Sequence, residues 1–201
     1  MRASTRREFV AGPAGRIECA VDSPDGEGRG VARGVALIAH PHPLFGGTLD
    51  NKVVQTLARA FVELGYEAWR PNFRGVGQTE GTHDEGRGEL EDLAAVLKFI
   101  RKDKLVLAGF SFGGSLVAQL AVKAKPEWLV LIGVGITRIM APPVPPGTLV
   151  IHGENDETVP LAAVLDWARP QDLPVVVVPG ADHFFHRKLQ VIKQIVLANR
   201  R

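Results

Sequence analysis

The amino-acid sequence predicts an α/β fold, in which a mainly parallel sheet carries helices on both faces. Short, continuously apolar runs, typical of strands buried on both faces, alternate with longer segments of helical periodicity. One apolar run, residues 105–108, leads straight into a Gly-x-Ser-x-Gly turn and then into helix-forming residues. The chain has 201 residues, 45% of them apolar, which is enough for one sizeable core, so we expect a single domain over residues 1–201.

The first half of the chain begins with a predicted hairpin. Apolar runs at residues 9–11 and 16–21, separated by Gly and Pro, predict its two strands, and the Gly/Asp/Pro-rich stretch 22–34 predicts a surface loop. The elements expected next are a buried strand at 35–39, a helix at 53–64, a strand at 67–70 and a helix at 88–100.

The second half repeats the alternation of strands and helices. After the strand at 105–108 and the helix at 115–123, we expect strands at 128–132, 149–151 and 175–178 and helices at 161–168 and 186–198. The carboxyl ends of parallel strands meet at one edge of a sheet, and sites in such folds lie at that edge. The polar residues that follow predicted strand ends are His40, Asn72, Ser111, Asp156 and His183.

Ser111 is the candidate nucleophile. It stands at the centre of the turn GFSFG, residues 109–113, between a buried strand and a helix. A strand that turns sharply into a helix strains the backbone at its tip, and flanking glycines leave room for neighbouring elements. The alternative is a structural serine in a glycine-rich turn, since the chain holds 22 glycines, but the strand-turn-helix context favours the nucleophile.

A serine hydroxyl needs a base near neutral pH, and the base needs an acid to orient it. His183 is preferred as the base because it lies between the last predicted strand and the last predicted helix, and His186 is its rival. For the acid, Asp156 is preferred and Glu154 is the fallback. Asp156 as a helix cap and His183 as a packed loop histidine remain alternatives. The order serine, aspartate, histidine is typical of hydrolases with a strand-turn-helix nucleophile.

Two backbone N–H groups are expected to bind the oxyanion formed during acyl transfer. One belongs to Phe112, directly after the nucleophile. The other should come from the loop at 40–47 (HPHPLFGG). Because Pro41 and Pro43 have no amide hydrogen, His42 is the expected second donor.

The composition excludes several other classes of function. The net charge is only +2 and the arginines are scattered, so we expect no nucleic-acid partner. The lone Cys19 allows no internal disulfide framework, and no stretch is long and apolar enough for a membrane partner or span. Arg6 and Arg7 resemble an export signal, but Gly, Pro and charged residues interrupt the stretch that follows. A cytoplasmic location is therefore expected.

Neither a metal nor an organic cofactor is expected. His40 and His42 have a His-x-His spacing, yet no third ligand cluster accompanies them. The glycine-rich stretch 75–81 is one residue too long for a dinucleotide fingerprint and precedes no immediate helix, so we interpret it as a flexible loop.

The serine turn, the acid loop and the segment GADHFF at 180–185 resemble the α/β-hydrolase superfamily over nearly the whole chain. More narrowly, residues 39–52 (AHPHPLFGGTLDNK) and 72–77 (NFRGVG) resemble small, lidless bacterial hydrolases related to dienelactone hydrolases and carboxylesterases. This resemblance implies an α/β-hydrolase fold without a cap domain. Pro41 stands where the superfamily often has glycine, and Ser111 replaces the cysteine nucleophile of dienelactone hydrolases, so lactone specificity does not carry over.

Many superfamily members insert a cap where this chain has only residues 133–147, a short segment with four prolines. We therefore expect an open, shallow site that suits short acyl esters. The side chains expected to border it, each of which could instead belong to the core, are Leu44, Phe45, Phe73, Phe112 and Phe184.

These observations predict a serine hydrolase, most directly a carboxylesterase that acts on a small-molecule ester through an acyl-enzyme. Ser111 attacks, His183 transfers the proton and Asp156 orients the imidazole, while the amides of His42 and Phe112 hold the oxyanion. Thioester or peptide cleavage would use the same side chains, because selection lies in the pocket. A binding or scaffold protein that retains the fold is the alternative from another class.

Overall fold

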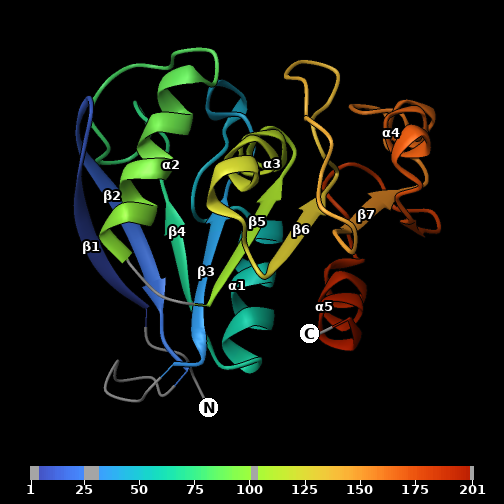
Figure 1. Ribbon diagram of the computed structural model, residues 1–201, viewed down its shortest axis with the longest axis horizontal. Coiled ribbons are helices and arrows are strands. Elements are labelled where there is room, and N and C mark those ends of the chain that lie inside the picture. The colour runs from blue at the N-terminus through green and yellow to red at the C-terminus, as the bar shows by residue number, and fades with distance from the viewer. Residues whose placement is uncertain (1–4, 25–31, 101–103, 200–201) are drawn as a thin grey trace.

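The computed structural model describes residues 5–24, 32–100 and 104–199, and an eight-stranded sheet with the order β1-β2-β4-β3-β5-β6-β7-β8 runs through it (Figure 1). The pairs from β4 across to β8 are parallel, and the β1–β2 hairpin adds to β4 in antiparallel fashion. The mainly parallel sheet is thus confirmed. The strands are β1 (Thr5–Gly12), β2 (Gly15–Asp22), β3 (Gly34–Ala39), β4 (Tyr66–Pro71), β5 (Leu105–Phe110), β6 (Trp128–Ile132), β7 (Leu149–Gly153) and β8 (Val175–Val178).

Helices cover both faces of the sheet, as predicted. Helices α1 and α5 pack together on one face, while α2 and α3, drawn in front of the sheet in Figure 1, pack together on the other. None of the described helices is long and apolar enough to cross a membrane. The helices are α1 (Lys52–Glu63), α2 (Arg87–Ile100), α3 (Phe112–Ala124), α4 (Leu161–Ala168) and α5 (Leu189–Ala198).

Alternation along the central strands divides the core into two clusters, one on each face. In β3, Leu37 belongs to the cluster that includes residues of α2, α3 and α4, while its neighbour Ile38 belongs to the cluster under α1 and α5. Both side chains are fully buried. Successive strand residues point to opposite faces, so a continuously apolar strand is what a sheet covered on both sides requires.

Helix α1 begins at a side-chain cap. By residue type either Asp50 or Asn51 could serve, and the structure assigns the role to Asn51, whose Oδ1 accepts hydrogen bonds from the amides of Val53 at 2.9 Å and Val54 at 3.4 Å. At the other end, Gly65 adopts φ +88°, which ends the helix and turns the chain into β4.

Helix α5 begins at Leu189, three residues later than the predicted start at His186. Phe185 and Arg187 have φ of 54° and 59°, which no right-handed helix accommodates. These turns place the Phe185 side chain in the core, where it is fully buried. Burial of one aromatic ring therefore decides where the helix begins.

The glycine-rich loop after β4 is held in place by side chains rather than being the flexible loop expected. One carboxylate oxygen of Glu18 accepts hydrogen bonds from Asn72 Nδ2 and from the Gln78 amide, both at 2.9 Å. Gly75 and Gly77, with φ of 77° and 57°, allow the tight path between these anchors. The other predicted loop, 22–34, has its interior at 25–31, outside the described residues.

Arg74 and Asp92 join this loop to α2 by two hydrogen bonds, Nε to Oδ2 at 2.8 Å and Nη2 to Oδ1 at 2.9 Å, and both side chains are buried. Asp92→Ala leaves the guanidinium buried without its carboxylate, so we expect the free energy of unfolding to fall by about 3–5 kcal/mol in urea denaturation. The double variant Arg74→Met/Asp92→Leu should lose much less. A loss below about 1 kcal/mol for Asp92→Ala would contradict this account.

Candidate active site

Ser111 lies at the point where β5 turns into α3, in a strained backbone conformation with φ 55° and ψ −120°. Its amide donates to the carbonyl of Ile132 at 2.9 Å, and its carbonyl accepts from the amide of Gly135 at 3.0 Å. The neighbouring strand β6 and the segment after it therefore hold the backbone in a conformation that a free chain would rarely adopt.

The glycines on either side of Ser111 are required by close backbone contacts. A Cβ atom at Gly109 would lie 2.4 Å from the carbonyl oxygen of Gly113, and one at Gly113 would lie 2.4 Å from the carbonyl oxygen of His40. Both contacts are with backbone, which cannot move aside cheaply. The Gly-x-Ser-x-Gly pattern thus follows from the sharpness of the turn.

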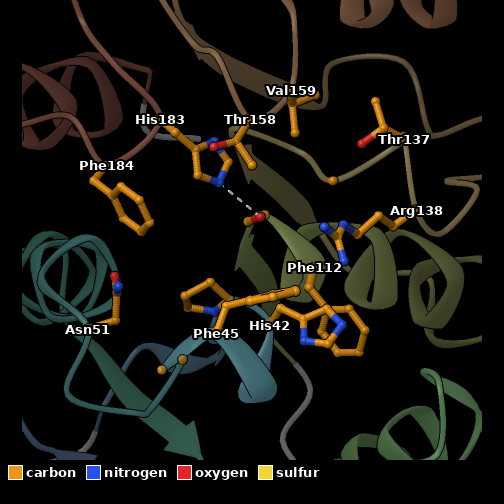
Figure 2. A pocket seen from close by; sticks show the side chains of 15 residues that line it. His42, Phe45, Asn51, Phe112, Thr137, Arg138, Thr158, Val159, His183 and Phe184 are labelled. Carbon is orange, nitrogen blue, oxygen red and sulfur yellow. Dashed lines mark hydrogen bonds between the residues drawn. The ribbon is translucent and has the colours of Figure 1, made fainter.

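The structure brings Ser111, His183 and Asp156 together in one chain of hydrogen bonds. His183 Nε2 lies 3.0 Å from Ser111 Oγ, the bond drawn in Figure 2, and His183 Nδ1 lies 2.7 Å from Asp156 Oδ2. Because a carboxylate only accepts, Nδ1 carries the proton and Nε2 is free to accept from the serine hydroxyl. All three residues are at least nine-tenths buried.

Asp156 is fixed by its own loop. Its second oxygen, Oδ1, accepts from the amides of Thr158 at 2.9 Å and Val159 at 2.7 Å. These bonds orient Oδ2 toward His183. A role as a helix cap was the alternative for Asp156. The structure shows that the cap-like hydrogen bonds through Oδ1 orient the other oxygen toward His183.

His152, at the end of β7, is a neighbour of the site that sequence reasoning missed. Its Nε2 lies 2.8 Å from the Val159 carbonyl and 3.5 Å from Asp156 Oδ2. The carbonyl can only accept, so Nε2 carries a proton, and burial lowers the pKa of His152. A neutral imidazole thus packs behind Asp156. Its position four residues before Asp156 is the only sequence signal that could have pointed to it.

The rival residues lie elsewhere. His186 is exposed and its Nδ1 lies 2.7 Å from Asp182 Oδ2. Glu154 accepts from the Gly180 amide at 2.7 Å, which links the two loops that carry Asp156 and His183. Neither side chain joins the hydrogen-bonded chain to Ser111.

The two amides expected to bind an oxyanion belong to residues that line the same pocket. The rings of His42 and Phe112 pack with centroids 4.7 Å apart. Within the described part of the chain, neither backbone N–H donates to a protein acceptor. The loop is closed by bonds from the amides of Phe45 and Gly47 to the His42 carbonyl, both at 3.1 Å. Both donors are thus available to a ligand.

The pocket beside Ser111 has a volume of about 290 Å³, and one of its walls is the short segment at 133–147. Of the apolar side chains expected to border it, Phe45, Phe112 and Phe184 do so. Phe73 does not, because it is 1% exposed and packs edge-on beneath Phe112, and the exposed Leu44 lies outside the lining. The polar side chains of the lining that sequence reasoning missed are Asn51, Thr137, Arg138 and Thr158.

Comparison with known proteins identifies the family. A family model described as alpha/beta hydrolase fold matches residues 42–146. Protein RP471 of Rickettsia prowazekii (strain Madrid E) is 32% identical over 212 residues, which cover 94% of this chain and 85% of RP471. The chain belongs to the α/β-hydrolase family.

Two solved structures resemble this α/β hydrolase over nearly its whole length. XC6422 from Xanthomonas campestris, described as an a/b serine hydrolase without lid, shares 37% identity with a TM-score of 0.90 and covers 99% of this chain and 94% of its own. An alpha-beta serine hydrolase homologue from Coxiella burnetii shares 36% identity with a TM-score of 0.87, and 100% of each chain is covered. The absence of a lid in the first agrees with the brief segment 133–147 here.

Two of the polar residues expected at the site of this hydrolase lie beneath it instead. His40 Nδ1 donates to the Pro41 carbonyl at 2.6 Å, and its Nε2 accepts from the Phe73 amide at 2.9 Å. Asn72 Oδ1 accepts from the Leu49 amide at 2.9 Å. Both side chains tie the loop after β3 to the loop after β4. Among the described residues, no group of three or more His, Cys, Asp or Glu side chains is arranged to hold a metal.

The pH dependence of stability should report on His40. Complete burial lowers the pKa of His40 from 6.5 to about 4. Between these values the unfolded chain binds a proton that the folded protein does not, so stability is lost as pH falls. From about pH 7 to pH 5, His40 alone should lower the free energy of unfolding by about 2 kcal/mol.

Urea denaturation at about pH 7 and pH 5 measures this loss. His40→Gln should flatten the pH dependence. His186→Gln, which removes an exposed imidazole, should leave it close to that of the wild type. Equal slopes for the wild type and His40→Gln would show that His40 is not buried in the neutral form.

Proposed function

We propose that this α/β hydrolase is a carboxylesterase that cleaves small esters through an acyl-enzyme. The observation that carries the proposal is the continuous chain from Asp156 through His183 to the Ser111 hydroxyl, at the edge of an open pocket. His183 Nδ1 donates to Asp156 and His183 Nε2 accepts from the Ser111 hydroxyl. This is the arrangement that nucleophilic catalysis needs.

In the first half of the proposed reaction, Ser111 Oγ attacks the ester carbonyl carbon while its proton passes to His183 Nε2. The charge that develops on the carbonyl oxygen is stabilised by the amides of His42 and Phe112. His183 then gives the proton to the departing alcohol oxygen as the C–O bond breaks, and the acyl group remains on Ser111. Asp156 stabilises the imidazolium throughout without taking its proton.

In the second half, water replaces the alcohol. His183 accepts a proton from the water as its oxygen attacks the acyl carbon, and the same amides stabilise the second oxyanion. Collapse of this intermediate returns the proton to Ser111 Oγ and releases the carboxylic acid. No other group in the described site is required for the proton transfers.

The pocket supports a preference for small acyl groups. Its volume of about 290 Å³ lies at the low end of the range for small-molecule sites. With only the segment 133–147 beside it, no cap extends the pocket to enclose a long chain. The aromatic rings of Phe45 and Phe184 offer apolar contact at its entrance, where each is about half exposed or more.

A cytoplasmic location belongs to the same proposal. The one cysteine, Cys19, is buried in β2, and burial raises the pKa of its thiol to about 12. A chain that makes no internal disulfide is suited to a reducing compartment.

A fluorophosphonate probe tests the nucleophile. We expect the wild type to be labelled, because a hydroxyl activated by a neutral imidazole attacks phosphorus as it attacks an ester. Labelling should be abolished in Ser111→Ala, as read by intact-protein mass spectrometry. Ser115→Ala, which alters a buried serine in the helix that follows Ser111, is the matched control and should label normally. A folded wild type that does not react would favour the scaffold alternative.

Asp156→Asn tests the acid. The amide cannot stabilise the imidazolium and favours the wrong tautomer, so kcat/KM for p-nitrophenyl butyrate should fall by at least about 100-fold. Glu154→Gln should retain activity within about threefold, because in the described part of the chain the Glu154 carboxylate accepts from the Gly180 amide and does not join the hydrogen-bonded chain to Ser111. An equal loss in the two variants would mean that the acid has been wrongly assigned. Parallel assays with a butyryl thioester and anilide should show the ester to be the preferred substrate.

A further inference from the structure

Arg138 is a charged side chain in the pocket wall that the proposed reaction does not use. It lies in the segment 133–147, where many α/β hydrolases would carry a cap, and its backbone amide bonds to the Gly135 carbonyl at 3.3 Å. Its guanidinium carbon lies 4.6 Å from the centre of the Phe45 ring. Figure 2 shows its side chain extending from the wall into the pocket.

Arg138 is exposed, and among the described residues its charge has no counter-ion. Buried arginines such as Arg70 and Arg74 pair with Asp22 and Asp92. Over the ranges that the structure describes, no carboxylate lies within ion-pair distance of Arg138, and the pocket lining includes no Asp or Glu.

Two acidic side chains whose charge reaches His42, Glu85 and Glu89, are paired with His83. Glu89 and Glu85 lie 2.8 Å and 3.7 Å from the ring nitrogens of His83, behind His42. Burial, the nearby His83 and the positive charge of Arg138 together lower the pKa of His42. The charges of Glu85 and Glu89 act on the pKa of His42 in the opposite direction. The field of Arg138 thus reaches the loop that carries a proposed oxyanion donor.

The position of Arg138 relative to His183 indicates which part of an ester it would meet. His183 gives its proton to the alcohol oxygen in the proposed reaction, so the alcohol lies on the side of His183 and Phe184, whose rings are 5.2 Å apart. In Figure 2, Arg138 lies on the other side of the pocket, with His42 and Phe112. An acyl chain attached to Ser111 and directed away from His183 would extend toward the guanidinium.

We propose that the preferred substrates are esters whose acyl chain ends in a carboxylate, that is, monoesters of dicarboxylic acids, and that Arg138 binds this carboxylate. The inference rests on the proposed esterase function and names its substrate class. A guanidinium supplies paired N–H donors that match a carboxylate, and stacking on Phe45 holds it in place without neutralising it. Arg138 is exposed, so a neutral acyl chain would leave the guanidinium to water and would gain no ionic contact from it.

Two p-nitrophenyl esters of equal chain length test the proposal: the monoester of adipic acid, with a terminal carboxylate, and the hexanoate, with a terminal methyl group. The quantity compared is the ratio of their kcat/KM values. In the wild type the ratio should favour the adipate monoester, and Arg138→Gln should lower it at least about tenfold, chiefly through KM. Arg138→Lys should restore part of the ratio.

Arg169→Gln is the matched control, since it removes one positive charge from an exposed pair with Asp166 away from the pocket, and it should leave the ratio unchanged. A third ester, 3-carboxyphenyl hexanoate, carries the charge on the alcohol side. An unchanged ratio in Arg138→Gln, or a preference only for the ester charged on the alcohol, overturns the proposal.

Calorimetric binding separates this proposal from the esterase function. In Ser111→Ala, monomethyl adipate should bind at least about tenfold more tightly than methyl hexanoate, and the added change Arg138→Gln should remove the difference. That result supports the anion site even if the wild type hydrolyses no ester. Failure to hydrolyse any ester would contradict the proposed function and leave the anion site supported. Equal affinities with and without Arg138 overturn the anion site.

Discussion

The site depends on one backbone constraint, the left-handed conformation of Ser111 between β5 and α3. A non-glycine residue held there costs of order 1–3 kcal/mol, so the surroundings must hold it in place. They do so through two hydrogen bonds to the Ser111 backbone from β6 and the segment after it, and through glycines that let the chain pass its neighbours at contact distance. The result is a hydroxyl raised above the sheet edge, within reach of His183.

Hydrogen bonds also hold the other polar side chains around the site in place. Asp156 is oriented by two amides of its own loop, and His40 joins the loops after β3 and β4 as a neutral imidazole. Glu18 and Asn72 extend that bonding to the hairpin. These buried hydrogen bonds anchor the pocket loops to the sheet. The side chains that face the pocket are not needed for this anchoring.

Much of this was predictable from the sequence, where local patterns decide. The bounds predicted for β6, α4 and β8 agree with the structure at both ends. In each case turn formers, Pro or Gly, lie on either side of the apolar run or helix and mark where the element begins and ends. Ser111, Asp156 and His183 could be named because each follows a strand that ends at the same edge of the sheet.

What the sequence could not predict depends on distant packing. The late start of α5 follows from the burial of Phe185, and the place of Phe73 beneath the pocket follows from its contacts with His40 and Phe112. Arg138 and His152 lacked any motif, since one becomes notable only when the pocket forms around it and the other only when β7 lies beside the acid loop. Such contacts join residues that are far apart in the chain, so they cannot be predicted from residue type alone.

The central claim is that Asp156, His183 and Ser111 form one directed chain of hydrogen bonds in the resting protein. Proton NMR of protein labelled with ¹⁵N-histidine tests it most directly, because an imidazole N–H that donates to a buried carboxylate is shielded from exchange and shifted far downfield. We expect such a resonance from Nδ1 of His183, lost in Asp156→Asn and retained in Glu154→Gln. Its absence from the folded wild type, or its persistence in Asp156→Asn, would contradict the account.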